Sequence, residues 1–209
     1  MIEEIANSIT CGVGLGLSIA GLVILVALAS FHGDAFRVVS FSIYGASLIL
    51  LYLTSTLYHA LQCRRAKHVF EIMDHSAVYV LIAGTYTPFM LVTLRGAWGW
   101  SLFGIVWSLA VFGIVFKSFH VKRFKAFSNM VYLAMGWLVV IAIQPMIKVL
   151  PLGAIAWLLA GGLLYSVGVF FYAHEKLPFG HAVWHLFVLG GSLCHFFSIF
   201  FYVLPPITK

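Results

Sequence analysis

Long apolar runs separated by short polar connections make up most of the chain. Seven of these runs reach about 20 residues, the length that an α-helix needs to cross the hydrocarbon core of a bilayer. The pattern therefore predicts seven membrane-spanning helices, at residues 9–31, 38–61, 71–94, 98–117, 128–147, 152–173 and 181–204. Because the connections are short, residues 1–209 are expected to form a single seven-helix transmembrane domain.

The composition agrees with this interpretation. Hydrophobic residues make up 63% of the 209-residue chain and charged residues only 9%, whereas a soluble domain averages about 25% charged residues. We therefore expect an all-α integral membrane protein. The formal net charge of +6 comes from basic residues in short connections, where membrane topology explains them, so no nucleic acid partner is expected. Within the first helix, Gly12-x-x-x-Gly16 is a spacing that suits close helix packing in a bundle.

The basic residues also predict the orientation in the membrane. The second, fourth and sixth connections lie on the same side as the N-terminus and hold eight Lys and Arg residues: Arg64, Arg65, Lys67, Lys117, Lys122, Arg123, Lys125 and Lys176. The other side holds four: Arg37, Arg95, Lys148 and Lys209. Since cytoplasmic connections carry an excess of Lys and Arg, the N-terminus is expected in the cytoplasm and the C-terminus outside.

A few ionisable side chains fall inside the predicted spans, where such residues are candidates for function. His59 lies near the end of the second helix, Asp74 near the start of the third, and His181 and His185 in the first two turns of the seventh. With the predicted topology, all four groups lie at the depth of the cytoplasmic leaflet. His75 is adjacent to Asp74 but is expected to point away from it, and we assign it no role.

Three of these histidines are candidate metal ligands. His181 and His185 are four residues apart and project from one helical face, a spacing at which two imidazoles can share a metal ion. His59 would supply a third nitrogen and leave the fourth position of a tetrahedral zinc site open, as in catalytic sites. Ser55 shares a helical face with His59, and Asp74 could hold a metal-bound water or orient an imidazole.

A polar stripe continues along the seventh helix. His195 lies ten residues beyond His185, about 15 Å deeper in the membrane, and Ser192 falls close to it on the same face. We interpret Ser192 and His195 as lining an internal cavity. For any one of these histidines, a hydrogen-bonded packing role is the alternative, and Asp74 could instead stabilise the start of its helix.

These residues resemble the signature of the hemolysin III family, which is grouped with the progestin and adipoQ receptors and the alkaline ceramidases as membrane hydrolases. The resemblance runs from EEIANSIT to the last helix and is carried by three motifs: Ser55-x-x-x-His59, Asp74 in FEIMDHSAVYVLIAGTYTPF, and His181-x-x-x-His185 followed by His195. It is strongest to the branch found in bacterial inner (plasma) membranes. One departure is Cys11-Gly12, where relatives often have His-Gly.

The resemblance implies seven helices with a cytoplasmic N-terminus and one zinc ion (Zn2+). By position, His59, His181 and His185 match the zinc ligands of the family, and Ser55 and Asp74 match the polar pair that accompanies them. Imidazole ligands also suit copper, iron and nickel. Reaction, substrate and oligomeric state are not specified by the residues or by the resemblance.

Three functions remain open at this point. The first is a zinc-dependent hydrolase of a lipid amide or ester with a role in membrane lipid homeostasis, in which Asp74 is the general base and Ser55 steadies the water or the developing oxyanion. The second is a lipid sensor or receptor in which the zinc only ties helices together. The third is a pore-forming, cytolytic protein, as the family name implies, although the acidic N-terminus resembles no export signal.

Overall fold

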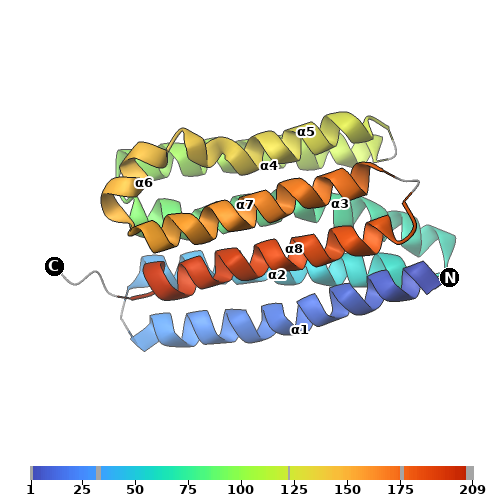
Figure 1. Cartoon of the computed structure of the whole chain (residues 1–209), viewed down its shortest axis with the longest axis horizontal. Coiled ribbons are helices and arrows are strands. Elements are labelled where there is room, and N and C mark those ends of the chain that lie inside the picture. The colour runs from blue at the N-terminus through green and yellow to red at the C-terminus, as the bar shows by residue number, and fades with distance from the viewer. Residues whose placement is uncertain (1, 32–33, 122, 175–176, 206–209) are drawn as a thin grey trace.

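The chain folds into a bundle of long helices (Figure 1), seen in a computed structural model that describes residues 2–31, 34–121, 123–174 and 177–205. The described residues contain no strand. The α-helices are α1 (Ile2–Phe31), α2 (Ala35–Ala60), α3 (Arg64–Pro88), α4 (Ala97–His120), α5 (Lys125–Gly136), α6 (Ile143–Val149), α7 (Leu152–Ala173) and α8 (Gly180–Ser198). Single π-helical stretches, Phe89–Thr93 and Ile199–Val203, extend α3 and α8, and a 3-10 stretch, Trp137–Val140, follows α5.

Six of the described helices are long and apolar enough to cross a membrane, and a seventh span is formed if α5 and α6 are taken together. The two parts of that span are bent by 49°. Pro145 explains the break, because proline lacks an amide hydrogen and its ring clashes with the carbonyl four residues earlier. The expectation of an all-α membrane protein is confirmed, and α1 begins at the opposite end of the bundle from the end of α8 (Figure 1).

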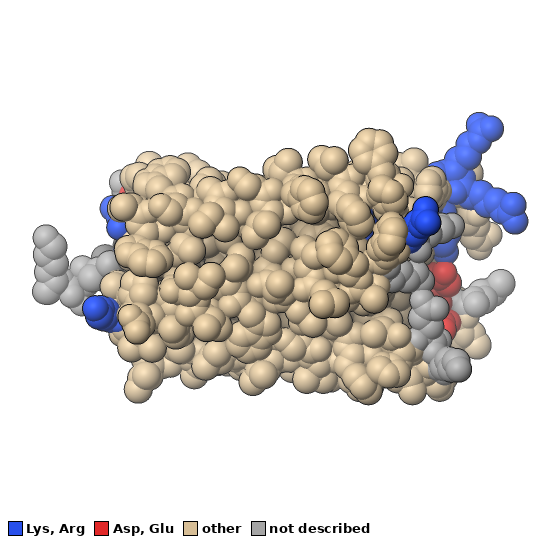
Figure 2. All heavy atoms as spheres, turned by 90° about the horizontal axis from the view of Figure 1, so that it is seen from above, with Lys and Arg blue, Asp and Glu red and all other residues tan. Residues whose placement is uncertain are grey.

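Charged side chains gather at the two ends of the bundle and leave a wide uncharged band between them (Figure 2). More of the Lys and Arg residues lie at the end that holds the start of α1, which is the end predicted to face the cytoplasm. Lys122, Lys176 and Lys209, which entered the prediction, lie outside the described residues. The uncharged band is the part of the surface that a bilayer would cover.

Two helix boundaries and one loop residue differ from the prediction. α1 begins at Ile2 rather than residue 9, and α3 begins at Arg64 rather than residue 71, because polar first turns can be helical without being apolar. Asp74 therefore lies almost three turns into α3 rather than one. Lys117, expected in a loop, is buried in the last turn of α4, where its Nζ donates to the Val121 carbonyl at 3.2 Å.

The glycines of α1 pack differently from the expectation. A Cβ atom at Gly12 or Gly16 would have no neighbour within 4 Å, so that pair is not used for packing within the bundle. Gly14 is used instead, since a Cβ there would lie 2.5 Å from the ring of Tyr52 on α2. The absence of a side chain at Gly14 thus lets α1 approach the face of α2 that carries the polar residues described next.

Candidate metal centre and its cavity

The structure brings together the three histidines predicted as ligands. His59, near the C-terminal end of α2, and His181 and His185, in the first two turns of α8, each offer one ligand atom, and these atoms lie within 4.8 Å of one another. The Nε2 atoms of His59 and His185 are 3.2 Å apart. Among the described residues, this is the one group of three or more potential ligands of this kind. The three histidines are close enough to bind a metal ion.

The donor set and its spacing fit zinc. Two nitrogens bound to one tetrahedral zinc ion at 2.0–2.1 Å are about 3.3 Å apart, close to the separation of the His59 and His185 Nε2 atoms. Both of these side chains are buried and His181 is half-buried. Without a cation, one of these two nitrogens donates to the other across the 3.2 Å separation. With a cation, the same separation suits two imidazoles that present their lone pairs to one ion.

Local structure on α8 sets the direction of two ligands. The helix begins at Gly180, directly after Phe179, which adopts the left-handed conformation with φ 57°. His181 and His185 then follow at one-turn spacing, with ring centroids 4.7 Å apart. The ring of Tyr172 on α7 packs against His181 at 5.6 Å. The start of the helix and this aromatic contact together hold the imidazoles toward α2.

The remaining ring nitrogen of His59 has a partner that the sequence analysis missed. Its Nδ1 lies 2.6 Å from Oε2 of Glu4 in the first turn of α1, and Oε1 of Glu4 accepts from Nζ of Lys67 on α3 at 2.8 Å. Asn7 Nδ2 is farther from the same Nδ1, at 3.5 Å. The sequence did carry a signal, since Glu4, Asn7 and Cys11 share one face of the first helix at helical spacing.

Ser55 and Asp74 lie beside the histidines rather than among them. Both side chains are buried, and the Ser55 hydroxyl hydrogen-bonds the Asp74 carboxyl. The thiol of Cys11 donates to Ser55 Oγ at 3.3 Å. Ser55, Asp74, His181 and His185 all line one cavity. The carboxyl group is thus placed next to the cluster on the side where a bound molecule would lie.

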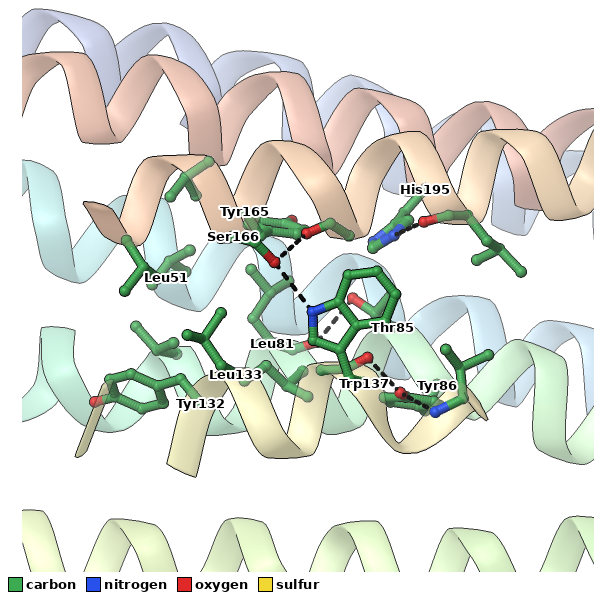
Figure 3. A pocket seen from close by; sticks show the side chains of 18 of the residues that line it. Leu51, Leu81, Thr85, Tyr86, Tyr132, Leu133, Trp137, Tyr165, Ser166 and His195 are labelled. Atoms are coloured by element: carbon green, nitrogen blue, oxygen red, sulfur yellow. Dashed lines mark hydrogen bonds between the residues drawn. The ribbon is translucent and has the colours of Figure 1, made fainter. Parts of the chain in front are cut away.

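The cavity has a volume of about 160 Å3 and a mostly apolar wall, contributed by α2, α3, α5, α7 and α8 and by the stretch that joins α5 to α6. Figure 3 shows Trp137, from this stretch, projecting toward α7, where its indole Nε1 donates to Ser166 Oγ at 3.1 Å. His195 also lines the cavity, and its Nε2 donates to the Leu158 carbonyl at 3.3 Å. The cavity extends along α8 from His181 to His195.

Ser192 does not belong to the lining residues. Its hydroxyl forms hydrogen bonds with the hydroxyls of Tyr52, at 3.0 Å, and Tyr165, at 2.9 Å. Both tyrosines line the cavity. The helical stripe of α8 placed Ser192 near His195, but side chains from α2 and α7 stand in front of it. Sequence periodicity within one helix does not include such neighbours.

His75, to which the sequence analysis assigned no role, also lines the cavity. Its Nδ1 donates to the Glu71 carbonyl at 2.7 Å, which leaves Nε2 to accept from the Tyr172 hydroxyl at 3.0 Å. Since Tyr172 packs against His181, His75 supports the wall of the cavity next to the cluster. Adjacent residues on a helix point about 100° apart. Both Asp74 and His75 nevertheless line the cavity, because its wall covers that part of the α3 surface.

Comparisons with known proteins agree with the resemblance seen in the motifs. A family model described as "Haemolysin-III related" matches residues 1–196. The chain is 56% identical over 203 residues to "Hemolysin-3" of Bacillus cereus, covering 97% of this chain and 93% of that protein. It is 55% identical over 200 residues to "Hemolysin-3 homolog" of Bacillus subtilis (strain 168), covering 96% and 94%.

A more distant similarity is found in animals. The chain is 27% identical over 207 residues to "Monocyte to macrophage differentiation factor" of Homo sapiens, covering 96% of this chain and 84% of that protein. No solved structure matches the chain significantly. The matched regions include every residue of the histidine cluster and its surroundings.

Proposed function

This chain belongs to the hemolysin III family of multi-pass membrane proteins, and on that premise we propose that it is a zinc-dependent hydrolase of a lipid amide or ester. One observation carries the proposal: two members of a three-histidine cluster, His181 and His185, and the buried carboxyl group of Asp74 line the same largely apolar cavity. A role in membrane lipid homeostasis follows from a lipid substrate. The bacterial relatives favour the bacterial inner (plasma) membrane as its location.

Three imidazoles are the ligand set of a catalytic zinc site that keeps one position open. When bound there, zinc supplies Lewis-acid polarisation of a carbonyl group and lowers the pKa of water to about 7. His59, His181 and His185 would hold it. Because the cluster adjoins the cavity through His181 and His185, a metal ion held by it would lie beside the space that a substrate would occupy.

Asp74 is the proposed general base. In the proposed reaction a water molecule attacks the carbonyl carbon of the lipid and gives one proton to the Asp74 carboxylate. The bond between that carbon and the amide nitrogen or ester oxygen breaks, and Asp74 returns the proton to the departing group. Ser55 hydrogen-bonds Asp74 and lines the same cavity, so it orients the carboxylate and lies close to the developing oxyanion.

The apolar wall of the cavity suits an acyl chain. Ten residues of α8 separate His185 from His195, about 15 Å along the helix, so a chain could extend from the cluster toward the middle of the membrane. The excess of Lys and Arg at the end of the bundle nearer the cluster favours a cytoplasmic location for that end. The scissile bond would then lie in the cytoplasmic leaflet, near lipid head groups.

A sensor or receptor is the second candidate, favoured by the way the cluster connects helices. The contacts of His59 join α1, α2, α3 and α8 through Glu4, Lys67 and His185. A metal ion in this position would tie the bundle together without any reaction. A pore-forming, cytolytic function is implied by the names of the bacterial relatives, but large apolar side chains exposed around the bundle suit a protein that resides in the bilayer.

The proposal is tested first by metal content. We expect about one zinc ion per purified chain by mass spectrometry, lost in His185→Ala and retained in the matched control His68→Ala, whose side chain is 56% exposed. Wild-type protein that is folded and holds no stoichiometric metal would contradict both metal-dependent functions.

Incubation with membrane lipid extract, followed by lipid mass spectrometry, then separates the hydrolase from the sensor. Zinc-dependent release of fatty acid supports the hydrolase, and bound but uncleaved lipid supports the sensor.

A further inference from the structure

Glu4 lies outside the cluster of ligands yet contacts one of them more closely than any other protein group does. Its Oε2 is 2.6 Å from His59 Nδ1, whereas the Nε2 atoms of His59 and His185 are 3.2 Å apart. We propose that Glu4 is a positioning residue for the metal centre, which fixes His59 in the tautomer that presents Nε2 to the metal ion. This inference rests on the metal binding of the proposed function.

The tautomer follows from counting hydrogens. A neutral imidazole carries one hydrogen, on either Nδ1 or Nε2, and an ionised carboxylate can only accept. The short contact with Glu4 therefore places the hydrogen on His59 Nδ1. Nε2 is then left with its lone pair, directed toward His185 and the centre of the cluster. Histidines that bind metals commonly donate their other ring hydrogen to a carboxylate in this way.

Asn7 is the other polar group near His59 Nδ1, and it is the weaker partner. Its Nδ2 is 3.5 Å away, at the limit of hydrogen-bond length, and an amide nitrogen donates rather than accepts. It therefore competes with the Nδ1 hydrogen instead of holding it. The Glu4 contact is shorter and charged, and hydrogen bonds to charged groups are the stronger ones. Glu4 thus determines which nitrogen carries the hydrogen.

Lys67 holds the carboxylate in place. Its Nζ donates to Glu4 Oε1 at 2.8 Å and lies 5.2 Å from the centre of the Tyr58 ring. The Glu4 side chain is 43% exposed, whereas the His59 side chain is only 3% exposed. Contact with water keeps the carboxylate charged at no large desolvation cost, while its partner remains buried. Glu4 therefore links the aqueous end of the bundle to the buried ligand.

A purely structural role for Glu4, as a tie between α1 and α2, makes different predictions. A tie would lower the thermal stability of the metal-free and zinc-loaded protein alike and leave the affinity for zinc unchanged. A positioning residue lowers the affinity for zinc and has little effect on the metal-free protein. Outer partners of ligating histidines typically contribute about 10- to 100-fold in metal affinity. The two roles are thus separated by a binding measurement that does not depend on turnover.

The experiment measures the zinc dissociation constant of the detergent-purified full chain by competition with a chelator, together with the melting temperature of the metal-free protein. Glu4→Ala is expected to weaken zinc binding about 10- to 100-fold, and Glu4→Gln, which keeps the shape but loses the charge, by less. Glu3→Gln is the matched control, because Glu3 is the neighbouring exposed carboxylate, and is expected to bind as the wild type does. The melting temperature of the metal-free protein is expected to stay unchanged.

The outcomes separate this inference from the function on which it rests. Wild-type affinity in both Glu4 variants, with zinc still lost in His59→Ala, overturns the role of Glu4 alone. Wild-type protein that binds no zinc overturns the role of Glu4 and the proposed function together. Cobalt substitution adds a spectroscopic readout, since a change in ligand orientation alters the visible absorption of Co2+ in Glu4→Gln. An unchanged spectrum with unchanged affinity would show that Glu4 only ties helices.

Discussion

The thiol of Cys11 lies 3.3 Å from the hydroxyl oxygen of Ser55, and that hydroxyl hydrogen-bonds the carboxyl of Asp74. One face of α1 therefore reaches both sides of the candidate site. Glu4 contacts the histidine cluster, and two turns later Cys11 contacts the pair proposed to handle protons. Both contacts go to residues of α2, which supplies His59 and Ser55 four residues apart.

Removal of the Cys11 thiol should weaken turnover without loss of metal. The thiol donates to Ser55 Oγ and so leaves the Ser55 hydrogen for Asp74. A hydrogen bond of this kind contributes about 0.5–1.5 kcal/mol, so Cys11→Ala should lower lipid turnover about two- to tenfold. Cys11→Ser keeps a donor and should lose less. Zinc content measured in the same samples should equal that of the wild type, and equal turnover in all three proteins would contradict the prediction.

Asp74 should be essential for turnover and dispensable for metal. Its carboxyl group lines the cavity next to the ligands and is not one of the three grouped histidines. Asp74→Ala and Asp74→Asn should therefore reduce hydrolysis about 100- to 10,000-fold, the usual effect of losing a general base. Bound zinc, measured by mass spectrometry, should remain near one per chain. Full activity in Asp74→Asn would exclude Asp74 from proton transfer.

Two glycines of α1 should respond in opposite ways to the same change. A Cβ at Gly14 would lie 2.5 Å from the Tyr52 ring, which is almost fully buried and held by Ser192. Gly14→Ala should thus destabilise the protein by about 1–3 kcal/mol. Gly12→Ala, where a Cβ would meet no atom within 4 Å, should be neutral or stabilising by up to about 1 kcal/mol. Melting temperatures in detergent measure both, and similar losses would show that α1 is rotated from its described position.

Cys63 offers a direct test of orientation. It lies exposed in the connection between α2 and α3, and hydrogen bonds from the backbone of Ala66 and Arg65 lower the pKa of its thiol. A lowered pKa raises the thiolate fraction at neutral pH, and the thiolate is the reactive form. A membrane-impermeant maleimide should label Cys63 readily in inside-out vesicles and not in intact cells.

The other two cysteines should not interfere with this labelling. Cys11 is buried and Cys194 is half-buried within α8. Cys63→Ser, which lacks the exposed thiol, is the control for background. Labelling of the wild type in intact cells would place the N-terminal end of the bundle outside and reverse the predicted topology.

The spans and the ligand cluster could be predicted because each depends on information local to one segment. A run of apolar residues marks a membrane helix wherever it packs, and the four-residue spacing of His181 and His185 fixes their common face. His59 joined them on the basis of its predicted depth and of the family resemblance. The bend between α5 and α6 has a local cause in Pro145. The position of Trp137 in the cavity wall could not be predicted in this way, because its indole hydrogen-bonds Ser166 on α7.

What escaped prediction depends on side chains from different helices. Glu4 looked like an ordinary acidic residue near the start of the chain, since its partners His59 and Lys67 are more than fifty residues away. Ser192 was placed in the cavity because nothing in α8 indicates that Tyr52 and Tyr165 stand before it. Such contacts depend on how neighbouring helices are rotated about their axes. The sequence of a single chain does not reveal these rotations.

The contact between the first turn of α1 and the histidines of α8 has a consequence for biogenesis. Glu4 lies in α1 and leaves the ribosome long before His181 and His185, which are synthesised only after six spans have been made. The complete centre therefore cannot exist on a nascent chain. If the centre binds zinc as proposed, the metal ion would be bound only after the last helix has inserted beside the first, and a chain truncated before α8 would lack two of the three ligands.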